Sequence, residues 1–269
     1  MLQKPNDRLD ACEMNKSARR PFYGEYAWAF DLLIDRPVAK ECAVIVSWLV
    51  ERGVVPGATL LDAGCGSGRY SAELARRGYI VHGIDSSPEL VALATERIGE
   101  TGMSSFAVGD ILTLPMGRYD AVLCRGVLND LLDDDARDGA FAAFGGALRP
   151  GGVLILDVRE WEASAARKSR EPVFTRTVST DRGTLTFTSV TKVDPTHRQL
   201  VLSERHTLRN DGREHVSDDQ FVMRCWTSDE LERVLRNSGF GEVRYFGAYD
   251  AAVDLGCTDR MVVVAQRTA

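Results

Sequence analysis

The sequence predicts an α/β fold in which a doubly wound, mostly parallel sheet is interrupted by an antiparallel β insert. Between residues 59 and 158, short apolar strand patterns alternate with helical patterns, which is typical of parallel strands joined by crossover helices. Between residues 161 and 225 the sequence becomes rich in Thr and Val, and turn signals separate its segments. From residue 226 onward a helix and two strands complete the sheet. The 269 residues, 44% of them apolar, suffice for one such domain with its insert.

The N-terminal region divides into a polar segment and a helical segment. Residues 1–20 mix Lys, Asp, Asn and Arg, and we expect them to be flexible. From Phe22 to Gly53 the pattern is helical, with a break at residues 35–37 and a closing glycine. We therefore expect a helical cap on a domain formed by residues 21–160 and 226–269.

The main sheet is predicted to have seven strands. They are expected at residues 59–63, 79–84, 105–109, 119–124, 152–158, 242–249 and 260–266. Helices are expected at residues 69–77, 87–99, 134–148 and 229–239. Three of these helices begin with capping signals, namely Ser87-Pro88, the aspartates of 133–135, and the capping box from Thr227 to Glu230.

The insert, residues 161–225, is predicted to be an antiparallel meander of three or four strands. Turn signals stand at residues 181–183, 194–195 and 210–212, between runs such as VFTRTV and QLVLSERHTL. These runs are rich in Thr, Val and Phe, which favours strands.

Composition excludes several classes of protein. The net charge of −6, without a basic stripe, argues against a nucleic-acid partner. No apolar run approaches the roughly 20 residues that span a bilayer, and MLQKPNDRLD lacks a signal-peptide core. We expect a cytoplasmic protein without a membrane partner. Six cysteines without metal-type spacing indicate reduced thiols and no bound metal.

A glycine-rich loop follows the first predicted strand, in LLDAGCGSGRY. Its glycines are Gly64, Gly66 and Gly68, at the strand end where open α/β sheets bind ligands. A dinucleotide fingerprint would need a further glycine at Arg69, so a pyrophosphate ligand is less favoured. Acids stand at Asp62 and at the ends of the next two strands, Asp85 and Asp110. These features predict a nucleoside ligand that is uncharged or positive.

Five motifs in order resemble the class I S-adenosylmethionine-dependent methyltransferases. They are LLDAGCGSG, GIDSSPELVALA, GDILTLP, YDAVLCRGVLNDL and LRPGGVLILD, over roughly residues 58–160. The insert resembles that of the small-molecule and sugar-amine N-methyltransferases, where it covers the active site. The resemblance implies a Rossmann-like seven-stranded sheet and S-adenosylmethionine as cofactor. The fourth motif lacks the signatures of the nucleic-acid base methyltransferases.

The resemblance implies roles for particular residues. The methionine portion of the cofactor would be held by Asp62, Gly64, Gly66 and Gly68, and the ribose hydroxyls by Asp85 with its neighbour Ser86. Asp110 and Ile111 would lie at the adenine edge, and Cys124 and Arg125 near the sulfonium. The aromatic segment 22–26, with Tyr26, would fold over the cofactor.

Several of these residues also have a purely structural interpretation. Asp62, Asp85 and Asp110 could cap the local turns that contain them. The cysteines could be small buried fillers, and the aromatic residues Tyr23, Tyr26 and Trp28 could belong to the core of the first helix.

Methyl transfer from a sulfonium depends chiefly on holding the nucleophile in line, and a general base adds a smaller factor. The catalytic candidates are Tyr23, Asn129 and Asp130, with His197, His206 and His215 on the insert as further candidates. The acids and aromatics favour a small-molecule acceptor with a basic amine, such as an amino sugar or another secondary metabolite, over a hydroxyl. A homodimer is one expected assembly.

Three alternatives remain open at this point. A NAD(P)-dependent oxidoreductase would use the same kind of sheet and strand-end acid. A non-catalytic S-adenosylmethionine-binding module would keep the pocket without the chemistry. A protein or RNA acceptor has only thin support in an acidic chain.

Overall fold

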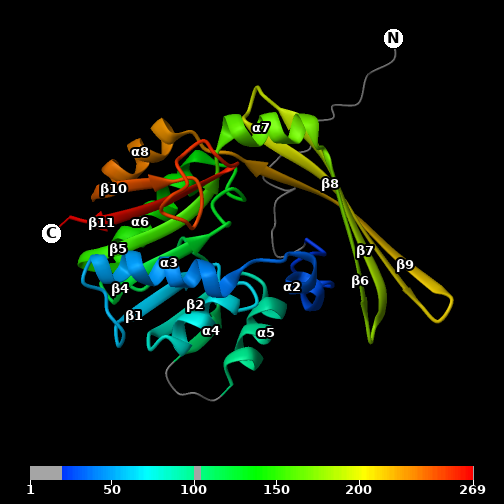
Figure 1. The fold of residues 1–269 in the computed structure, drawn as a ribbon, viewed down its shortest axis with the longest axis horizontal. Helices are drawn as coiled ribbons and strands as arrows, with labels where there is room; N and C mark the ends of the chain where they lie inside the picture. The colour runs from blue at the N-terminus through cyan, green and yellow to red at the C-terminus, as the bar shows by residue number, and fades with distance from the viewer. Residues whose placement is uncertain (1–19, 100–103, 269) are drawn as a thin grey trace, which may run out of the picture.

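The chain contains two sheets, one parallel in its greater part and one antiparallel (Figure 1). This computed structural model describes residues 20–99 and 104–268. The predicted flexible segment 1–20 lies outside the described residues except for Arg20. The α/β class, the seven-stranded main sheet and the antiparallel insert are as predicted from the sequence.

The main sheet has the strand order β10-β11-β5-β4-β1-β2-β3. Its strands are β1 (Thr59–Ala63), β2 (Ile80–Asp85), β3 (Ser105–Val108), β4 (Tyr119–Arg125), β5 (Leu148–Arg159), β10 (Phe240–Phe246) and β11 (Arg260–Arg267). The first five are parallel, whereas β11 runs antiparallel to both β5 and β10. Strand order reverses at β1, which pairs with β2 on one side and β4 on the other. Ligands of open α/β sheets bind at such a switch point.

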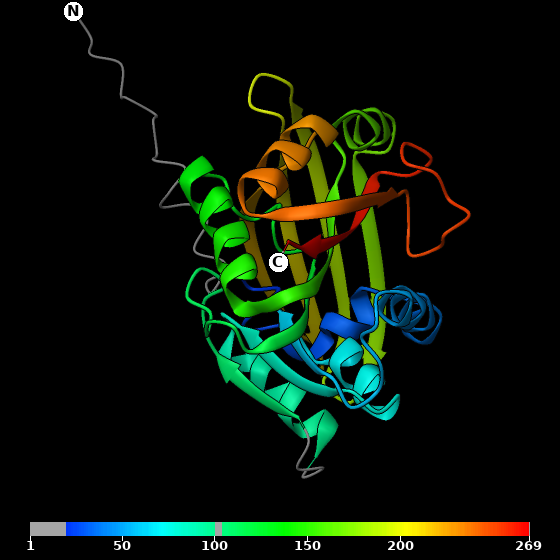
Figure 2. The same ribbon diagram turned by 90° about the vertical axis from the view of Figure 1, so that its left-hand side faces the viewer.

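Helices cover both faces of this sheet (Figures 1 and 2). They are α3 (Val38–Glu51), α4 (Arg69–Arg76), α5 (Pro88–Ile98), α6 (Asp134–Ala147) and α8 (Ser228–Asn237). On one face α3 and α4 pack against the sheet around Trp48, Leu49 and Leu74. On the other face α6 and α8 enclose a core that includes Phe141, Phe144, Leu231, Val234 and Leu235.

The predicted caps are present. Ser87, Asp133 and Thr227 each accept a hydrogen bond from a backbone N–H in the first turn of α5, α6 and α8. These bonds satisfy donors that a helix N-terminus otherwise leaves unpaired.

The insert is a four-stranded antiparallel sheet, β6-β7-β8-β9. Its strands are β6 (Val173–Thr180), β7 (Gly183–Asp194), β8 (Gln199–Asn210) and β9 (Arg213–Arg224). It is preceded by α7 (Trp161–Arg170), which the sequence reasoning placed within the antiparallel segment. That expectation was wrong because α7 buries little: its buried residues are Trp161 and Ser164, too few for a helical periodicity.

The N-terminal segment is less helical than predicted. Residues 21–26 form turns, followed by η2 (Ala27–Ala29) and the short helix α2 (Phe30–Leu33). Its apolar side chains pack on the insert rather than on a helix of their own: Phe22 and Tyr26 join Leu185 and Phe187 of β7 in one cluster. Figure 1 shows α2 between the main sheet and the insert.

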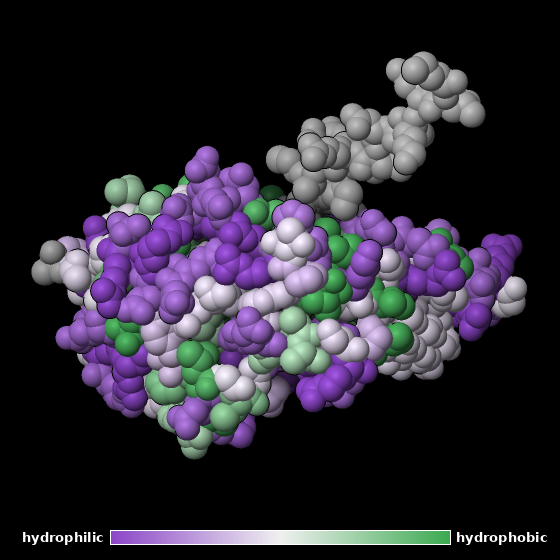
Figure 3. All heavy atoms as spheres, turned by 90° about the horizontal axis from the view of Figure 1, so that it is seen from above, coloured by the Kyte–Doolittle hydropathy of each residue, from purple (hydrophilic) through white to green (hydrophobic). Residues whose placement is uncertain are grey.

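In the part of the chain that the structure describes, no helix combines the length and the apolar character that a membrane crossing requires. Seen from above, hydrophilic residues make up much of the surface, with smaller hydrophobic areas between them (Figure 3).

Gly68 provides a test of how tightly the loop after β1 is built. Its φ is +73°, and a Cβ there would lie 2.8 Å from Cβ and 2.9 Å from Cα of Ala94 on α5. We predict that Gly68→Ala combines a left-handed backbone cost of about 1–2 kcal/mol with an overpacking cost of about 1–3 kcal/mol. Urea unfolding measures the sum as a loss of unfolding free energy.

Gly53→Ala is the matched control for this substitution. Gly53 has a similar φ of +79° with open space around its Cβ position, so only the backbone cost applies. Equal losses for the two variants would contradict a close approach of the loop to α5.

Candidate functional site

The glycine loop after β1 is held against the end of β2. The backbone N–H groups of Gly64 and Cys65 both donate to the carbonyl of Ile84, at 2.8 and 2.9 Å. Gly64, Gly66 and Gly68 all have positive φ, which accounts for three glycines in five residues. At Gly66 a Cβ would meet nothing within 4 Å, so this part of the loop faces open space.

Asp85 connects the loop to the next helix. Its carboxylate accepts hydrogen bonds from the N–H of Gly66 at 2.8 Å and the N–H of Ser87 at 2.9 Å. Burial raises its pKa, while these backbone donors act in the opposite direction. The side chain therefore connects the loop after β1 to the end of β2 at the switch point of the sheet, and it binds the N–H of Ser87, the residue that caps α5. Ser86 is exposed beside it.

Asp62 is almost completely buried beneath the loop, with 3% of its surface exposed. Its carboxylate accepts a hydrogen bond from the hydroxyl of Ser71 on α4. Burial is the main cause that raises its pKa. The contact ties the end of β1 to the first turn of the following helix.

Asp110 and Ile111 follow β3, at the same edge of the sheet. The Asp110 carboxylate accepts from the N–H of Leu112 at 2.9 Å, so it caps its own turn, and the residue is exposed. Ile111 is buried and packs in the core beneath it. This hydrogen bond is the one that the interpretation of Asp110 as a turn residue predicts.

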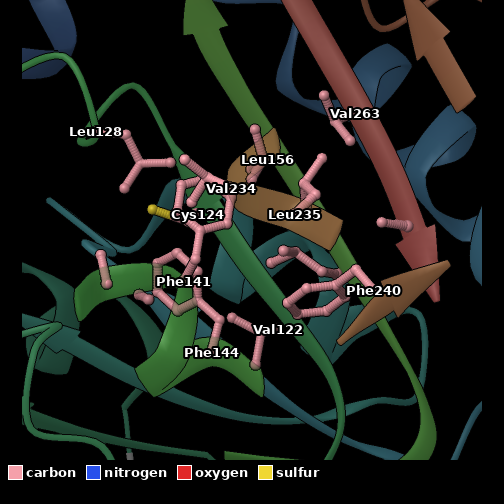
Figure 4. Packing of buried hydrophobic residues seen from close by; sticks show 14 of the residues in the cluster. Val122, Cys124, Leu128, Phe141, Phe144, Leu156, Val234, Leu235, Phe240 and Val263 are labelled. Atoms are coloured by element: carbon pink, nitrogen blue, oxygen red, sulfur yellow. The ribbon is translucent and has the colours of Figure 1, made fainter. Parts of the chain in front are cut away.

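The structure places the side chains of Cys124 and Arg125, at the carboxyl end of β4, on opposite faces of the main sheet. Cys124 is fully buried, with its sulfur among Leu128, Phe141 and Val234 (Figure 4). Successive side chains of a strand point to opposite faces, so Arg125 projects to the other side. Its guanidinium carbon lies 3.1 Å from the ring centre of Tyr70, and its side chain bonds to Tyr249 and Glu41. Arg125 therefore connects the end of β4 to α3, to α4 and to Tyr249.

The N-terminal segment is docked directly on the glycine loop. Asp31 of α2 accepts from the hydroxyl of Ser67 at 2.6 Å and pairs with Arg69 at 2.8 Å. Arg69 also donates to the carbonyl of Ile34 at 2.8 Å. The residue that replaces the third glycine of a dinucleotide fingerprint thus fixes the cap to the loop.

Tyr23 and Tyr26 lie at different places within this segment. The backbone carbonyl of Tyr23 accepts a 2.7 Å hydrogen bond from the hydroxyl of Ser87, beside Asp85. Tyr26 instead stacks on His206 of β8, with ring centroids 4.4 Å apart and planes within 2°. Tyr26 therefore belongs to the contact between the segment and the insert, in agreement with its interpretation as a core aromatic.

The loop after β4 joins the glycine loop to the two ends of the insert. A Cβ on Gly64 would lie 2.2 Å from a methyl carbon of Val127, so the two loops are in close contact. Asn129 is 3% exposed; its side-chain oxygen accepts from the N–H of Arg159 at 2.9 Å, and its carbonyl accepts from the N–H of Arg224 at 2.8 Å. Arg159 ends β5 and Arg224 ends β9, so one residue binds the chain where it leaves for the insert and where it returns.

Asp130, the next residue, faces a cluster of polar side chains that the sequence reasoning did not find in full. The hydroxyl of Tyr23 donates to its carboxylate at 3.4 Å, and Arg20 donates to that hydroxyl at 2.8 Å. Arg20 in turn forms two hydrogen bonds with Glu204 of β8. Burial raises the pKa of Asp130 to about 7, against the opposing effects of Arg20 and Tyr23.

Arg20 and Glu204 are the residues that sequence reasoning missed. A signal existed for Glu204: it occupies an inward position in the alternating strand that also buries Leu200, Leu202 and His206. A charge at such a position needs a partner. Nothing in the local sequence identifies that partner as Arg20, which is 184 positions away.

The histidines of the insert separate into two kinds. His206 is fully buried against aromatic rings, and burial lowers its pKa to about 4. His197 is exposed and pairs with Asp194 in its turn, and His215 is exposed and pairs with Glu25. Within residues 20–99 and 104–268, no group of three or more His, Cys, Asp or Glu side chains is arranged to hold a metal ion.

Comparisons with known proteins agree with this architecture. Residues 61–156 match the family model described as "Methyltransferase domain". The chain is 39% identical over 88 residues to a magnesium-protoporphyrin O-methyltransferase from Synechocystis, covering 31% of this chain and 38% of that protein. It is 36% identical over 125 residues to a ubiquinone biosynthesis O-methyltransferase from Xanthomonas campestris, covering 45% and 51%. The alignments therefore span about half the length of these relatives, or less.

Solved structures extend the likeness over nearly the whole chain. An S-adenosylmethionine-dependent methyltransferase from Clostridium acetobutylicum aligns with a TM-score of 0.75 at 19% identity, covering 91% of this chain and 98% of its own. A sugar N-methyltransferase from Streptoalloteichus aligns with a TM-score of 0.74 at 20% identity, covering 91% and 94%. The chain has the fold of these class I methyltransferases, and residues 61–156 within that fold match the methyltransferase-domain model. The resemblance that the five motifs indicated is confirmed at this level.

Asn129 provides a test of the link between the two loops and the insert. Asn129→Ala removes the acceptor for the Arg159 N–H, and leaving that buried donor unpaired costs about 1–3 kcal/mol. We predict this loss of unfolding free energy in chemical denaturation. Asn237→Ala, at an exposed position of α8, is the control and should change little. An unfolding free energy of Asn129→Ala equal to that of the wild type would show that the hydrogen bond between Asn129 and Arg159 contributes no stability.

Proposed function

We propose that this protein is an S-adenosylmethionine-dependent methyltransferase that methylates a nitrogen or oxygen of a small molecule by in-line displacement. Of the acceptors that the sequence left open, an amine is favoured, such as that of an amino sugar or another secondary metabolite. Positioning of the acceptor is the main catalytic contribution. The observation that carries the proposal is the juxtaposition of Asp85 and the glycine loop with Tyr23 and Asp130 at one edge of the sheet.

The residues present fit the cofactor. Gly66 leaves open space at the loop, and Asp85 lies beside it as a carboxylate acceptor for ribose hydroxyls. Asp62, Gly64 and Gly68 would shape the methionine end, and Ser86, Asp110 and Ile111 the adenosine end. Cys124 and Arg125 would support the floor from behind, and Tyr26 would hold the covering segment. When bound, S-adenosylmethionine supplies a methyl group on a positively charged sulfur.

The chain's own groups then act on the acceptor. Tyr23 and Asp130 would contact it, and Asn129 would hold the loop that carries Asp130. A protonated amine has no free electron pair, so it must first give one proton, which the carboxylate of Asp130 can take, before the neutral nitrogen is methylated; a hydroxyl would give its proton to the same carboxylate as its oxygen is methylated. Since Arg20 is neutralised by Glu204, the remaining carboxylates Asp85 and Asp130 favour a cationic amine over a neutral hydroxyl.

Further parts of the proposal concern partners. The acidic chain supports a small-molecule acceptor rather than a nucleic acid. The names of two solved neighbours, an amino pentose methyltransferase from Micromonospora echinaspora and the sugar N-methyltransferase above, are consistent with an amino sugar. Cytoplasmic location and homodimer formation stay predictions.

Methyl transfer from labelled S-adenosylmethionine tests the function itself. Incubation with a panel of amino sugars, simple amines and phenols is expected to label at least one amine, with S-adenosylhomocysteine as the second product. Failure with every class, together with binding of NADH but not of S-adenosylhomocysteine, would favour an oxidoreductase. Binding without transfer to any acceptor would favour a module that has lost its chemistry.

Asp85 provides the binding test. We predict that Asp85→Asn weakens the binding of S-adenosylmethionine at least about tenfold, because hydrogen bonds to a charged acceptor contribute about 1.5–3 kcal/mol. Isothermal titration calorimetry measures the change. Asp120→Asn is the control, since Asp120 lies at the opposite end of the strands, bonded to the N–H of Thr59. Equal affinities of the wild type and of Asp85→Asn for S-adenosylmethionine would contradict a contact between Asp85 and the ribose hydroxyls.

A further inference from the structure

A buried ion pair connects the insert with the N-terminal segment beside the proposed acceptor site. Nε and Nη2 of Arg20 donate to the two carboxylate oxygens of Glu204, at 2.8 and 2.5 Å. The two side chains are 6% and 1% exposed. The guanidinium also lies 3.9 Å from the ring centre of Phe221. Charges are seldom buried to this degree without a partner, and here both partners are almost fully withdrawn from water.

The hydrogen bonds of this group have a defined direction. A guanidinium can only donate, so the Tyr23 oxygen must accept from Nη1 of Arg20 at 2.8 Å. The hydroxyl hydrogen of Tyr23 is then available to the carboxylate of Asp130, at 3.4 Å. Glu204 fixes the guanidinium at two of its nitrogens, and so determines where the third one points.

Among the described residues, charged and titratable groups from the N-terminal segment, from β8 and from the end of β2 act on Asp130. Arg20 and Tyr23 approach from the N-terminal segment, Glu204 from β8 and Asp85 from the end of β2. The cation and the phenol donor stabilise the ionised carboxylate, while the two other carboxylates disfavour it. Removal of Arg20 and removal of Glu204 should therefore affect Asp130 in opposite directions.

We propose that Arg20, Tyr23 and Glu204 form a chain of ordered hydrogen bonds that reaches from the insert to Asp130 and sets how readily this carboxyl group accepts a proton. Arg20 and Glu204 are positioning residues in this chain. The inference rests on the proposed function, in which Asp130 gains the proton that the acceptor loses. Through Glu204 the insert thus contributes to the chemistry as well as covering the site.

Carbon-13 NMR of the protein labelled at aspartate carboxyl carbons tests the chain directly. The Asp130 resonance is assigned by its absence in Asp130→Asn, and its chemical shift is followed against pH. In the wild type its midpoint is expected near the pKa of about 7. We expect Arg20→Gln and Tyr23→Phe to move the midpoint to higher pH, the former by about one pH unit or more. Glu204→Gln should move it to lower pH.

The direction of these changes separates a positioning role from a structural one. General loosening of the site would move all variants the same way, toward the value of an exposed carboxyl group, and that outcome would overturn the proposal. So would unchanged midpoints in Arg20→Gln and Glu204→Gln. If Arg20→Gln fails to fold, the midpoints of Tyr23→Phe and Glu204→Gln still test the proposal, because they should move in opposite directions. The double variant Arg20→Gln with Glu204→Gln avoids the unpaired buried charge that would prevent folding.

Arg205→Gln is the matched control. Arg205 follows Glu204 in β8 and points to the other face of the insert, where it is 61% exposed and pairs with Asp218 at 2.6 Å. Its removal changes the net charge as Arg20→Gln does, and it should leave the Asp130 midpoint in place. The titration requires no methyl transfer, so failure of the acceptor panel and failure of this inference are separate results.

Discussion

The site depends on one contact, the hydrogen bond that the backbone N–H of Gly66 donates to the half-buried carboxylate of Asp85. It joins the loop after β1 to the end of β2 across the point where strand order reverses. The glycines make the contact possible, because the loop needs positive φ values that residues with a side chain rarely adopt. The same Asp85 also orients Ser87, whose hydroxyl holds the covering segment at Tyr23.

The insert is tied to the loop after β4 at both of its ends. Asn129 binds the backbone of Arg159 and Arg224, where the chain enters and leaves the second sheet. At its middle, the insert reaches the floor through Glu204, Arg20 and the Tyr23 hydroxyl. Removing one partner of a buried ion pair typically costs about 3–5 kcal/mol, because the other charge is left buried without a partner, so neither Arg20 nor Glu204 can be replaced alone at low cost. The proposed acceptor site is therefore built by three distant parts of the sequence.

The sequence predicted the features that local patterns determine. The glycine loop, the strand-end acids and the caps at Ser87, Asp133 and Thr227 all follow from neighbouring residues, and all have the expected positions. Features that depend on tertiary contacts were missed. The motif around Arg125 did not reveal its contact with the ring of Tyr70, which lies in the first turn of α4 directly after the glycine loop. Glu204 and Arg20 could be paired only in three dimensions, and α7 lacked the periodicity that would have revealed it.

A crystal structure of the protein with S-adenosylhomocysteine would test the central claim most directly. The account predicts ribose hydroxyls on Asp85, the thioether sulfur directed toward the space beside Tyr23 and Asp130, and an intact pair between Arg20 and Glu204. A nucleoside bound elsewhere, or a sulfur turned away from Asp130 with that pair broken, would contradict it.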